Sequence, residues 1–373
     1  MGSLRCTIVM PLAEQRGGAE SALLALLRHG RGLGFAWRVV FLEDGPMVAA
    51  CAAAGAPSTV LPAGRLRELH RYARTVGGLA RALRRDRPDV VVGWMTKAQL
   101  YAGPAARLAG APAVWCQHGM PLPRSALDRV ATVLPARGVV AVSQAGARAQ
   151  RSLAPHRPVA VVHPGIDLAR FDPERLPAPA EARARLGLPG AGPLVGVVAR
   201  LQRWKGVHVL VEALPQVLGE QPELHCVVVG GVHALEPDYE PYLRRRVADL
   251  GLEQCVLFAG QRSDVAPWLQ AMDVVVSAAA DEPFGLTIVE AMALGKPVVA
   301  AAGGGPRDIV RDAIDGVLVA PGDVGGLASA VTRVLADPER AARLGRAARQ
   351  RARAFSSERY AARFAAAVVD LIA

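Results

Sequence analysis

The stretch VVVSAAADEPFGLTIVEAMALGKPVVAA, residues 274–301, contains two short apolar runs with a segment of helical composition between them. The runs Val274–Ser277 and Val298–Ala301 consist mainly of valine and alanine, which is typical of strands buried on both faces. The intervening Gly285–Leu294 has the length of a helix. Strand, helix and strand in this order predict parallel pairing, because parallel strands need a long crossover between them. The stretch therefore predicts an α/β fold built on a parallel sheet.

The same alternation of apolar runs and helical segments extends through the rest of the chain. Before residue 168, strands are predicted at Arg5–Met10, Trp37–Leu42, Asp89–Gly93, Ala113–Cys116, Val139–Val142 and Val159–Val162. After residue 193, further strands are predicted at Leu194–Ala199, Leu224–Val229, Cys255–Phe258 and Val317–Val319. Helices are predicted at Glu20–Arg28, Val207–Leu218, Glu240–Leu250 and Leu327–Leu335, with a helical block at Pro338–Ala373. This pattern predicts two doubly wound parallel-sheet domains in tandem.

Residues 168–193 interrupt the alternation and mark the predicted domain boundary. The segment has no apolar run with strand character, and it is rich in proline, at Pro173, Pro177, Pro179, Pro189 and Pro193. Ligands of doubly wound sheets bind beyond the carboxyl ends of the strands. A cleft between the two domains is therefore the expected site.

Composition restricts the class of protein. Of 373 residues, 51% are hydrophobic and 21% are charged, which excludes an intrinsically disordered chain. No apolar run has the length of a membrane-spanning helix. The five cysteines are scattered and have no metal-binding spacing, which indicates a reducing, cytoplasmic setting.

The net charge is +11, from 44 basic and 33 acidic residues. All basic residues except Lys97, Lys205 and Lys296 are arginines, and alanine, glycine and proline are abundant. This combination is typical of coding bias in a GC-rich genome. The arginines are not interleaved with aromatic residues, so no nucleic-acid partner is expected.

Two short segments have the composition of phosphate-binding loops. Gly17 and Gly18 follow the first predicted strand and open the first helix, where free backbone amides suit an anion. An ordinary loop-to-helix turn is the alternative.

Arg200 follows a buried strand and Lys205 precedes the next helix, so the sequence places two cations suited to a diphosphate at one sheet edge. For this pair, two solvated surface charges are the alternative.

The segment Asp281–Glu290 carries the most specific pattern. Pro283 keeps Glu282 outside the following helix, whose first residues present unpaired backbone amides. Glu290 lies about one and a half turns inside that helix. A carboxylate at the helix start and another further in suit a ligand that carries hydroxyl groups beside a phosphate. A capped helix with glutamate in its first half is the alternative.

In their order along the chain, these segments resemble the family 4 glycosyltransferases, which are retaining enzymes of the GT-B fold. The resemblance runs from the first strand to the last helix. It is carried by Gly17-Gly18-Ala19-Glu20, Gln117-His118-Gly119, Val142-Ser143, Val162-His163-Pro164-Gly165-Ile166-Asp167, Arg200 with Lys205-Gly206, Val229-Gly230-Gly231, Glu282 with Glu290, and Gly303-Gly304-Gly305-Pro306. Two positions depart from the pattern, since relatives often have Asn at the position of Pro164 and Glu at that of Asp308. Neither is a catalytic position.

The resemblance implies a GT-B fold of two Rossmann-like domains with an inter-domain cleft. The acceptor-side domain would span residues 1–168 and be completed by a C-terminal helix at 355–373, and the nucleotide-sugar-binding domain would span 169–354. The implied reaction moves a hexose-type sugar from a nucleotide diphosphate sugar to a hydroxyl acceptor, with retention. A UDP sugar is the expected donor, because UDP is common among relatives. No Asp-x-Asp motif is present, and neither a metal nor another cofactor is expected.

The resemblance also implies roles for single residues. Glu290 would bind the ribose hydroxyls, Glu282 would contact the transferred sugar, and Arg200 with Lys205 would neutralise the diphosphate. His118 would lie beside the reacting carbon, and Gly17 and Gly18 would lie against the diphosphate and acceptor. Arg262 would belong to the loop that flanks the base. The sugar and phosphate oxygens would be bound by the backbone amides of Phe284, Gly285, Leu286 and Thr287. Without the resemblance, the sequence indicates only that His118 is a histidine at the end of a strand, with its side chain hydrogen-bonded to the backbone. Trp94–Tyr101 and Gly119–Arg124 would line the acceptor site.

Two other functions fit the sequence. A non-hydrolysing sugar-nucleotide epimerase would also bind a nucleotide sugar on this fold, although the two glutamates and the Arg200/Lys205 pair favour transfer. A basic membrane- or polyanion-binding protein is suggested by Arg65–Arg87, where arginines alternate with leucines. An ordinary solvated helix face is the alternative for that stretch. The expected location is the cytoplasm, with contact to the inner face of the membrane left open.

Overall fold

The computed structural model describes residues 3–15, 17–64 and 68–373. The described residues form two compact units. Unit 1 comprises Met1–Ile166 and Ser357–Ala373, and unit 2 comprises Asp167–Ser356. The boundaries predicted from the sequence, after residue 168 and before residue 355, differ from these by two residues each.

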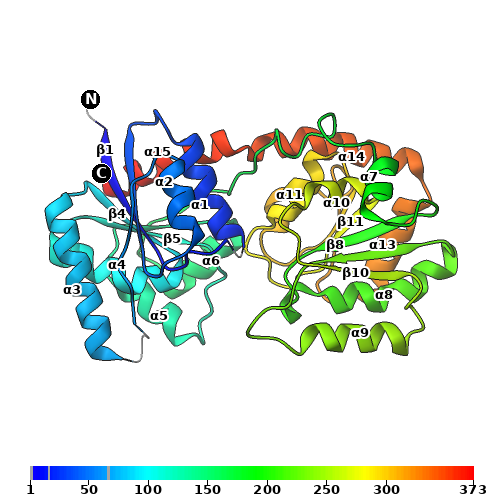
Figure 1. Cartoon of the computed structure of the whole chain (residues 1–373), viewed down its shortest axis with the longest axis horizontal. Coiled ribbons are helices and arrows are strands. Elements are labelled where there is room, and N and C mark those ends of the chain that lie inside the picture. Colours follow the sequence, from blue (N-terminus) through cyan, green and yellow to red (C-terminus); the bar gives the residue numbers. More distant parts are fainter. Residues whose placement is uncertain (1–2, 16, 65–67) are drawn as a thin grey trace. The chain divides into compact units, whose positions relative to one another are not determined.

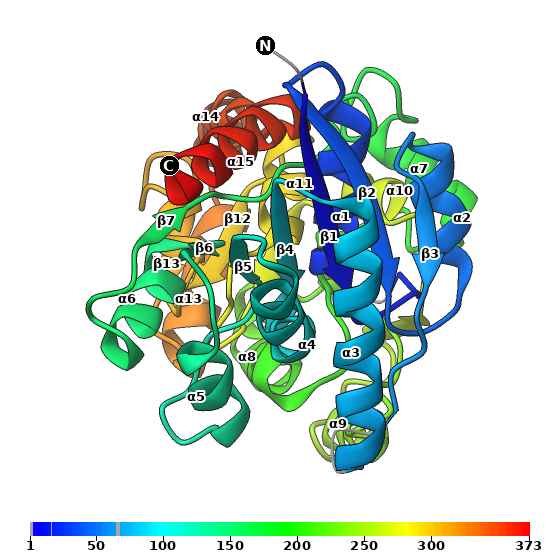
Figure 2. The same cartoon turned by 90° about the vertical axis from the view of Figure 1, so that its left-hand side faces the viewer.

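In the described part of unit 1, a seven-stranded parallel sheet (Figure 1) has the order β3-β2-β1-β4-β5-β6-β7, which can be followed in Figure 2. Its strands are β1 (Leu4–Met10), β2 (Phe35–Phe41), β3 (Ser58–Val60), β4 (Val90–Trp94), β5 (Ala113–Gln117), β6 (Gly138–Ala141) and β7 (Val159–Val161). The strand order reverses between β1 and β4, and such a switch point is where sheets of this kind bind ligands at the carboxyl edge.

Helices cover both faces of the unit 1 sheet. They are α1 (Gly18–His29), α2 (Pro46–Ala53), α3 (Leu69–Asp86), α4 (Met95–Ala109), α5 (Ala126–Val133), α6 (Gln144–Leu153) and α15 (Ser357–Ile372). Along β1, Cys6, Ile8 and Met10 pack in one core with residues of α1 and α15. Val9 points to the opposite face and packs with residues of α3 and α4, which run side by side (Figure 2). Because successive strand residues face opposite sides, this central strand is apolar along most of its length.

In the described part of unit 2, a six-stranded parallel sheet has the order β10-β9-β8-β11-β12-β13. Its strands are β8 (Leu194–Val198), β9 (His225–Val229), β10 (Val256–Gly260), β11 (Val274–Ser277), β12 (Val298–Ala301) and β13 (Val317–Val319). The order reverses between β8 and β11, so the switch point of unit 2 lies at the ends of these two strands.

Helices also cover both faces of the unit 2 sheet (Figure 1). They are α7 (Pro179–Leu186), α8 (Val207–Glu220), α9 (Tyr239–Asp249), α10 (Ala266–Ala271), α11 (Leu286–Ala293), α12 (Pro306–Ile309), α13 (Val324–Leu335) and α14 (Pro338–Ala352), with 3-10 turns η1 (Arg203–Lys205) and η2 (Arg353–Phe355). Residues of α8, α9 and α13 form one core with the sheet. Helices α10 and α11 contact strands β8, β11 and β12.

The predicted two-sheet α/β fold is confirmed, and the structure corrects two details. The sequence prediction missed β3, Ser58–Val60, because its three residues form an edge strand with no apolar run. The helical block predicted at Pro338–Ala373 is two helices, α14 and α15, separated by η2. The 3-10 turn ends the first helix, and the second belongs to unit 1.

The arginine-rich stretch proposed as a membrane-binding helix is mainly α3, and its residues 65–67 lie outside the described residues. Leu79 and Leu83 are buried in the unit 1 core, whereas Arg81 and Arg84 are exposed. At Leu79 and Leu83, α3 therefore packs against its own unit, and these two leucines are not available as lipid contacts. Leu69, at the start of the helix, is 77% exposed. In the described part of the chain, no helix combines the length and apolarity needed to cross a membrane.

Candidate active site

The carboxyl edge of β8 and β11 brings together the cations and carboxylates of unit 2 that were predicted from the sequence. Arg200 lies two residues beyond the end of β8, and Lys205 ends the following turn η1. Glu282 lies in the loop between β11 and α11. This edge is the switch point of the sheet, where loops on either side diverge and leave room for a ligand.

Lys205 and Glu282 form an ion pair at this switch point. Lys205 Nζ donates to Glu282 Oε2 at 2.6 Å, and the two side chains are 17% and 11% exposed. The turn that carries Lys205 ends at Gly206, whose φ of +70° is unfavourable for other residues. A side chain at Gly206 would also collide with the backbone oxygen of Ala278 beyond β11. The close approach of these two loops therefore places the ammonium group against the carboxylate.

The Arg200 guanidinium is exposed at the same edge. Among the described residues, no carboxylate or carbonyl oxygen binds it, in contrast to Arg203, which pairs with Asp238 at 2.6 Å. An exposed guanidinium at the edge that also carries Lys205 can bind the oxygens of a diphosphate in forked geometry.

A glycine-rich loop after β12 fixes the backbone of Glu282. The Glu282 N–H donates to Gly303 O at 3.1 Å, and the Gly305 N–H donates to Glu282 O at 2.7 Å. Gly304, between them, has a φ of +83°, and a side chain there would collide with the Glu282 carbonyl. The sequence analysis included this loop in the family pattern but gave it no role. Its geometry indicates that it holds Glu282 in position.

Replacing Gly304 with alanine is expected to displace Glu282 and to lower both stability and catalytic turnover. The backbone strain alone costs about 1–3 kcal/mol of unfolding free energy. Gly322→Ala is the matched control, because Gly322 has a φ of +75° but nothing within 4 Å of the added carbon. Thermal unfolding and turnover of both variants test this role. Equal losses of turnover in the two variants would contradict it.

Helix α11 begins beside the ion pair. Its N-cap is Gly285, with a φ of +112°, and Leu286 and Thr287 are its first two residues. Their amides precede the first intrahelical hydrogen bonds and carry the positive end of the helix dipole. This end of the helix can therefore bind the oxygens of an anion.

Glu290 lies in the second turn of α11 and is half-buried. Burial raises the pKa of its carboxyl from the usual 4.5 to about 7, and the positive charge of Arg170 opposes this shift. Arg170 in turn donates to Asp264 Oδ1 at 3.0 Å and to Ser263 O at 3.3 Å. The loop at 261–264, predicted to flank a base, is thus tied to the surroundings of Glu290. Arg262 of that loop is exposed, with its guanidinium 5.0 Å from the centre of the Trp268 ring.

In unit 1, one tryptophan links the two predicted site segments. Gly17 is the N-cap of α1 and Gly18 its first residue, while His118 follows β5. The Trp94 indole N–H donates to Ala19 O at 3.0 Å, and the Trp94 ring lies 4.7 Å from the His118 ring. Trp94 was predicted to lie in a wall of the acceptor site. The structure places it in the core, where it supports His118.

The predicted acceptor wall at Trp94–Tyr101 is mostly core. Residues 98–101 are buried with Trp94, so only 95–97 of this segment are accessible. Met95 has a φ of +73°, a strained conformation that is frequent at functional sites. The Thr96 hydroxyl donates to Asp128 Oδ1 at 3.2 Å, and Asp128 Oδ2 accepts from the Leu122 N–H at 3.1 Å. Asp128, which the sequence analysis missed, therefore joins the two predicted acceptor segments.

Comparisons with known proteins identify the family. A model described as Glycosyltransferase Family 4 matches residues 16–170, and a model described as Glycosyl transferases group 1 matches residues 180–351. The chain belongs to the family 4 glycosyltransferases. Each of the two models covers most of one unit. Both describe glycosyltransferases, so the matches favour sugar transfer over the alternative of an epimerase.

Individual relatives within the family agree with this result. A D-inositol 3-phosphate glycosyltransferase of Salinispora arenicola is 41% identical over 54% of this chain and 47% of its own length. One of Streptomyces avermitilis is 35% identical over 71% of this chain and 59% of its own length. The chain thus spans about half the length of the curated relatives it matches. The crystal structure of Anabaena HepE in complex with UDP and glucose has a TM-score of 0.87 at 28% identity, covering 98% of this chain and all of that one.

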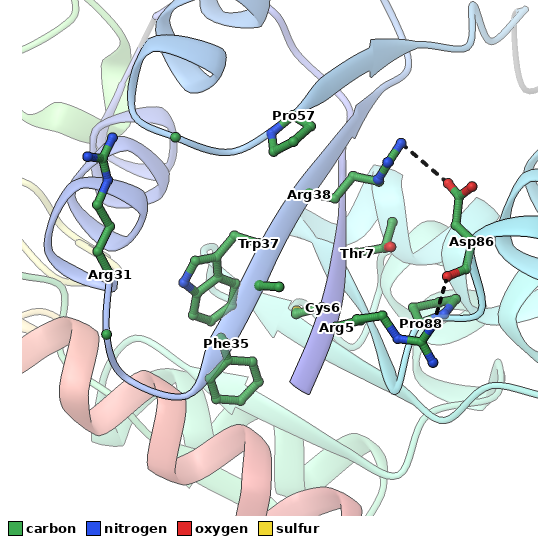
Figure 3. A pocket seen from close by; sticks show the side chains of 13 residues that line it. Arg5, Cys6, Thr7, Arg31, Phe35, Trp37, Arg38, Pro57, Asp86 and Pro88 are labelled. Atoms are coloured by element: carbon green, nitrogen blue, oxygen red, sulfur yellow. Dashed lines mark hydrogen bonds and ion pairs between the residues drawn. The ribbon is translucent and has the colours of Figure 1, made fainter. Parts of the chain in front are cut away.

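A separate pocket of about 480 Å³ lies at the amino ends of β1 and β2, opposite the edge that carries the site residues of this family 4 chain (Figure 3). Three arginines line it with Phe35 and Trp37. Arg38 pairs with Asp86 at 3.4 Å, and Arg5 donates to Asp86 O at 3.5 Å. Arg31 donates to Ala54 O at 3.1 Å. Each guanidinium already has a hydrogen-bond partner in the protein, so the pocket gives no independent sign of a ligand.

Proposed function

We propose that the chain is a retaining glycosyltransferase that moves a hexose from a nucleotide diphosphate sugar to a hydroxyl acceptor. The observation that carries the proposal is the Lys205–Glu282 ion pair beside the start of α11, at the switch point of unit 2. In this pair, a cation that could neutralise a leaving phosphate contacts a carboxylate that could accept hydrogen bonds from sugar hydroxyls. Family membership supports the same reaction class.

The diphosphate leaving group gains negative charge as the bond to the sugar breaks. Arg200, Lys205 and the amides of Leu286 and Thr287 supply positive charge and hydrogen-bond donors for it. Groups that are already in place stabilise a developing charge with little reorganisation, and this is the largest source of catalysis in many enzymes. We propose that these groups take the place of a divalent metal in neutralising the diphosphate.

Glu282 and Glu290 divide the recognition of the donor in this proposal. Glu290 lies further inside α11 and accepts hydrogen bonds from the ribose hydroxyls. Glu282 lies at the helix start and contacts the transferred sugar. We propose a UDP sugar as the donor, supported by HepE, whose structure holds UDP and glucose.

No carboxylate is assigned as a nucleophile in this proposal. Retention then follows from a substitution on one face of the sugar, in which the leaving phosphate accepts the acceptor proton. His118 takes part in the transfer by binding the sugar. The accessible residues 95–97 and 119–124 of unit 1 are proposed to bind the hydroxyl acceptor.

A panel of nucleotide sugars tests the function. Thermal stabilisation of the full chain identifies the donor, and proton NMR of the glycoside formed from that donor reports the anomeric configuration. We expect stabilisation by a UDP sugar and retention of the donor configuration. Inversion, or stabilisation by no nucleotide sugar, would refute the proposal.

Removal of divalent metals is expected to leave turnover unchanged. The reason is that Arg200, Lys205 and the start of α11 supply the positive charge that a metal would otherwise bring. Turnover in excess EDTA, compared with turnover in added Mg²⁺ or Mn²⁺, measures this. Loss of activity in EDTA that either metal restores would contradict the metal-independent mechanism.

A further inference from the structure

A cysteine contacts the imidazole of His118 inside unit 1. Cys116 Sγ lies 3.3 Å from His118 Nε2, which is within hydrogen-bond distance for sulfur. Cys116 is the last residue but one of β5, and His118 is the first residue after the strand. The cysteine is 1% exposed. Neither the family match nor the comparisons give this thiol a role.

Both partners are uncharged in the folded protein near neutral pH. Burial raises the pKa of the Cys116 thiol far above its usual range, so the sulfur keeps its proton. Burial lowers the pKa of His118 to about 3, so its ring carries a single proton. One S–H and one N–H are therefore available to the pair, and the position of the ring proton determines which group donates.

The chemistry of the two atoms favours the thiol as donor. A thiol sulfur is a weak acceptor, whereas the lone pair of a neutral imidazole nitrogen is a good one. A proton on Nε2 would have only sulfur as its acceptor. With the proton on Nδ1 instead, Nε2 accepts the S–H, and Nδ1–H becomes the outward donor.

The rest of the ring is oriented for this role. Trp94 packs against the imidazole at 4.7 Å and is itself anchored to Ala19 O. Among the described residues, no protein group binds Nδ1, and the His118 side chain is only half-buried. The N–H on this nitrogen is thus left for a ligand.

We propose that the Cys116 thiol fixes His118 as a neutral imidazole with its proton on Nδ1, and that this N–H donates to a hydroxyl oxygen of the donor sugar. The proposal rests on the proposed glycosyltransferase function for the identity of the ligand. Cys116 is a positioning residue, because it acts only through the ring. In this arrangement the neutral His118 ring donates one hydrogen bond to the sugar.

Nitrogen–proton NMR of the histidine rings in the free full-length protein tests the tautomer directly. His118→Gln identifies the signal by its loss. We expect the Nδ1–H form, with no titration between pH 5.5 and 8, and a changed tautomer ratio in Cys116→Ala. Cys6→Ala is the matched control, because Cys6 is a strand thiol of the same core and is also 1% exposed. The Nε2–H form in the wild type, or an unchanged ratio in Cys116→Ala, would overturn the proposal.

Transfer kinetics provide a second test, because a merely structural role of Cys116 would not produce the pattern of rates described next. The side-chain amide nitrogen of asparagine lies near the position of Nδ1 in histidine. The side-chain amide nitrogen of glutamine lies near the position of Nε2. We therefore expect His118→Asn to retain more kcat/KM than His118→Gln. Loss of the positioning bond in Cys116→Ala should lower kcat/KM about three- to tenfold, with partial rescue by Cys116→Ser and no change in Cys6→Ala. The opposite order of the two His118 variants would overturn the assignment of the donor nitrogen. Absence of transfer by the wild type with every donor would refute the proposed function, whereas the NMR result would still decide the tautomer.

Discussion

Replacing Lys205 with alanine is expected to lower turnover about 100- to 1000-fold, the size typical for loss of one preorganised group that stabilises developing charge. The physical reason is that Lys205 lies beside the start of α11, where the leaving diphosphate is proposed to gain charge. Donor affinity should fall less than turnover, because the charge on the leaving group is larger in the transition state. Initial rates over a range of donor concentrations separate the two effects.

The same substitution should also destabilise the folded protein. It removes the donor from Glu282, whose side chain is only 11% exposed, and a buried acceptor without its partner costs about 1–3 kcal/mol. In the double variant Lys205→Ala with Glu282→Gln, the uncompensated charge is gone, so stability should largely return while turnover stays low. Arg185→Ala is the control, because Arg185 pairs with Glu181 on the exposed side of α7 and such pairs contribute little. Similar losses of stability in Lys205→Ala and Arg185→Ala would contradict the buried character of the Lys205–Glu282 pair.

Affinity for UDP is expected to rise about tenfold between pH 6 and pH 8 and to lose this rise in Glu290→Gln. Burial holds the pKa of Glu290 at about 7, so its carboxyl is mostly protonated at pH 6 and mostly ionised at pH 8. An ionised carboxylate accepts hydrogen bonds from ribose hydroxyls more strongly than the acid does. Glu290→Gln also controls for titration of the nucleotide phosphate, which is the same in both proteins. An identical pH dependence in the two proteins would rule out Glu290 as the ribose ligand.

Protein stability should show the opposite trend with pH. The pKa of Glu290 is higher in the folded protein than the ordinary 4.5. The acid form is therefore favoured by folding, and its contribution is complete below about pH 4.5 and is lost as the pH rises through about 7. The stability of the wild type relative to Glu290→Gln should fall across this range, as measured by chemical unfolding at several pH values.

Valine-rich strands were the most predictable part of the fold. The bounds of β11, β12 and β13 were predicted without error, because each is a short run rich in valine. The edge strand β3 was missed, because Ser58–Val60 is half exposed and has too little apolar character to separate it from a loop. Burial on both faces gives a strand a visible pattern, and an edge strand lacks it.

The site was predictable as a set of residues but not as a set of contacts. Lys205 and Glu282 are 77 positions apart, and their ion pair depends on the order of strands in the sheet, which the sequence did not reveal. The contact between Cys116 and His118 joins residues only two apart, so it could have been considered from the sequence. It was missed because cysteines were considered only as metal ligands or disulfide partners. The hydrogen bond from Trp94 to Ala19 joins the end of β4 to the first turn of α1 and had no local signal.

The division of roles between Glu282 and Glu290 is the central claim, and calorimetric titration of UDP into the two glutamine variants tests it most directly. The account predicts that Glu290→Gln weakens UDP binding at pH 8 by roughly 1–3 kcal/mol, the size of a hydrogen bond to a charged group. It predicts that Glu282→Gln binds UDP nearly as well as the wild type while its turnover falls, because UDP lacks the sugar that Glu282 contacts. An equal loss of UDP affinity in both variants would contradict the account.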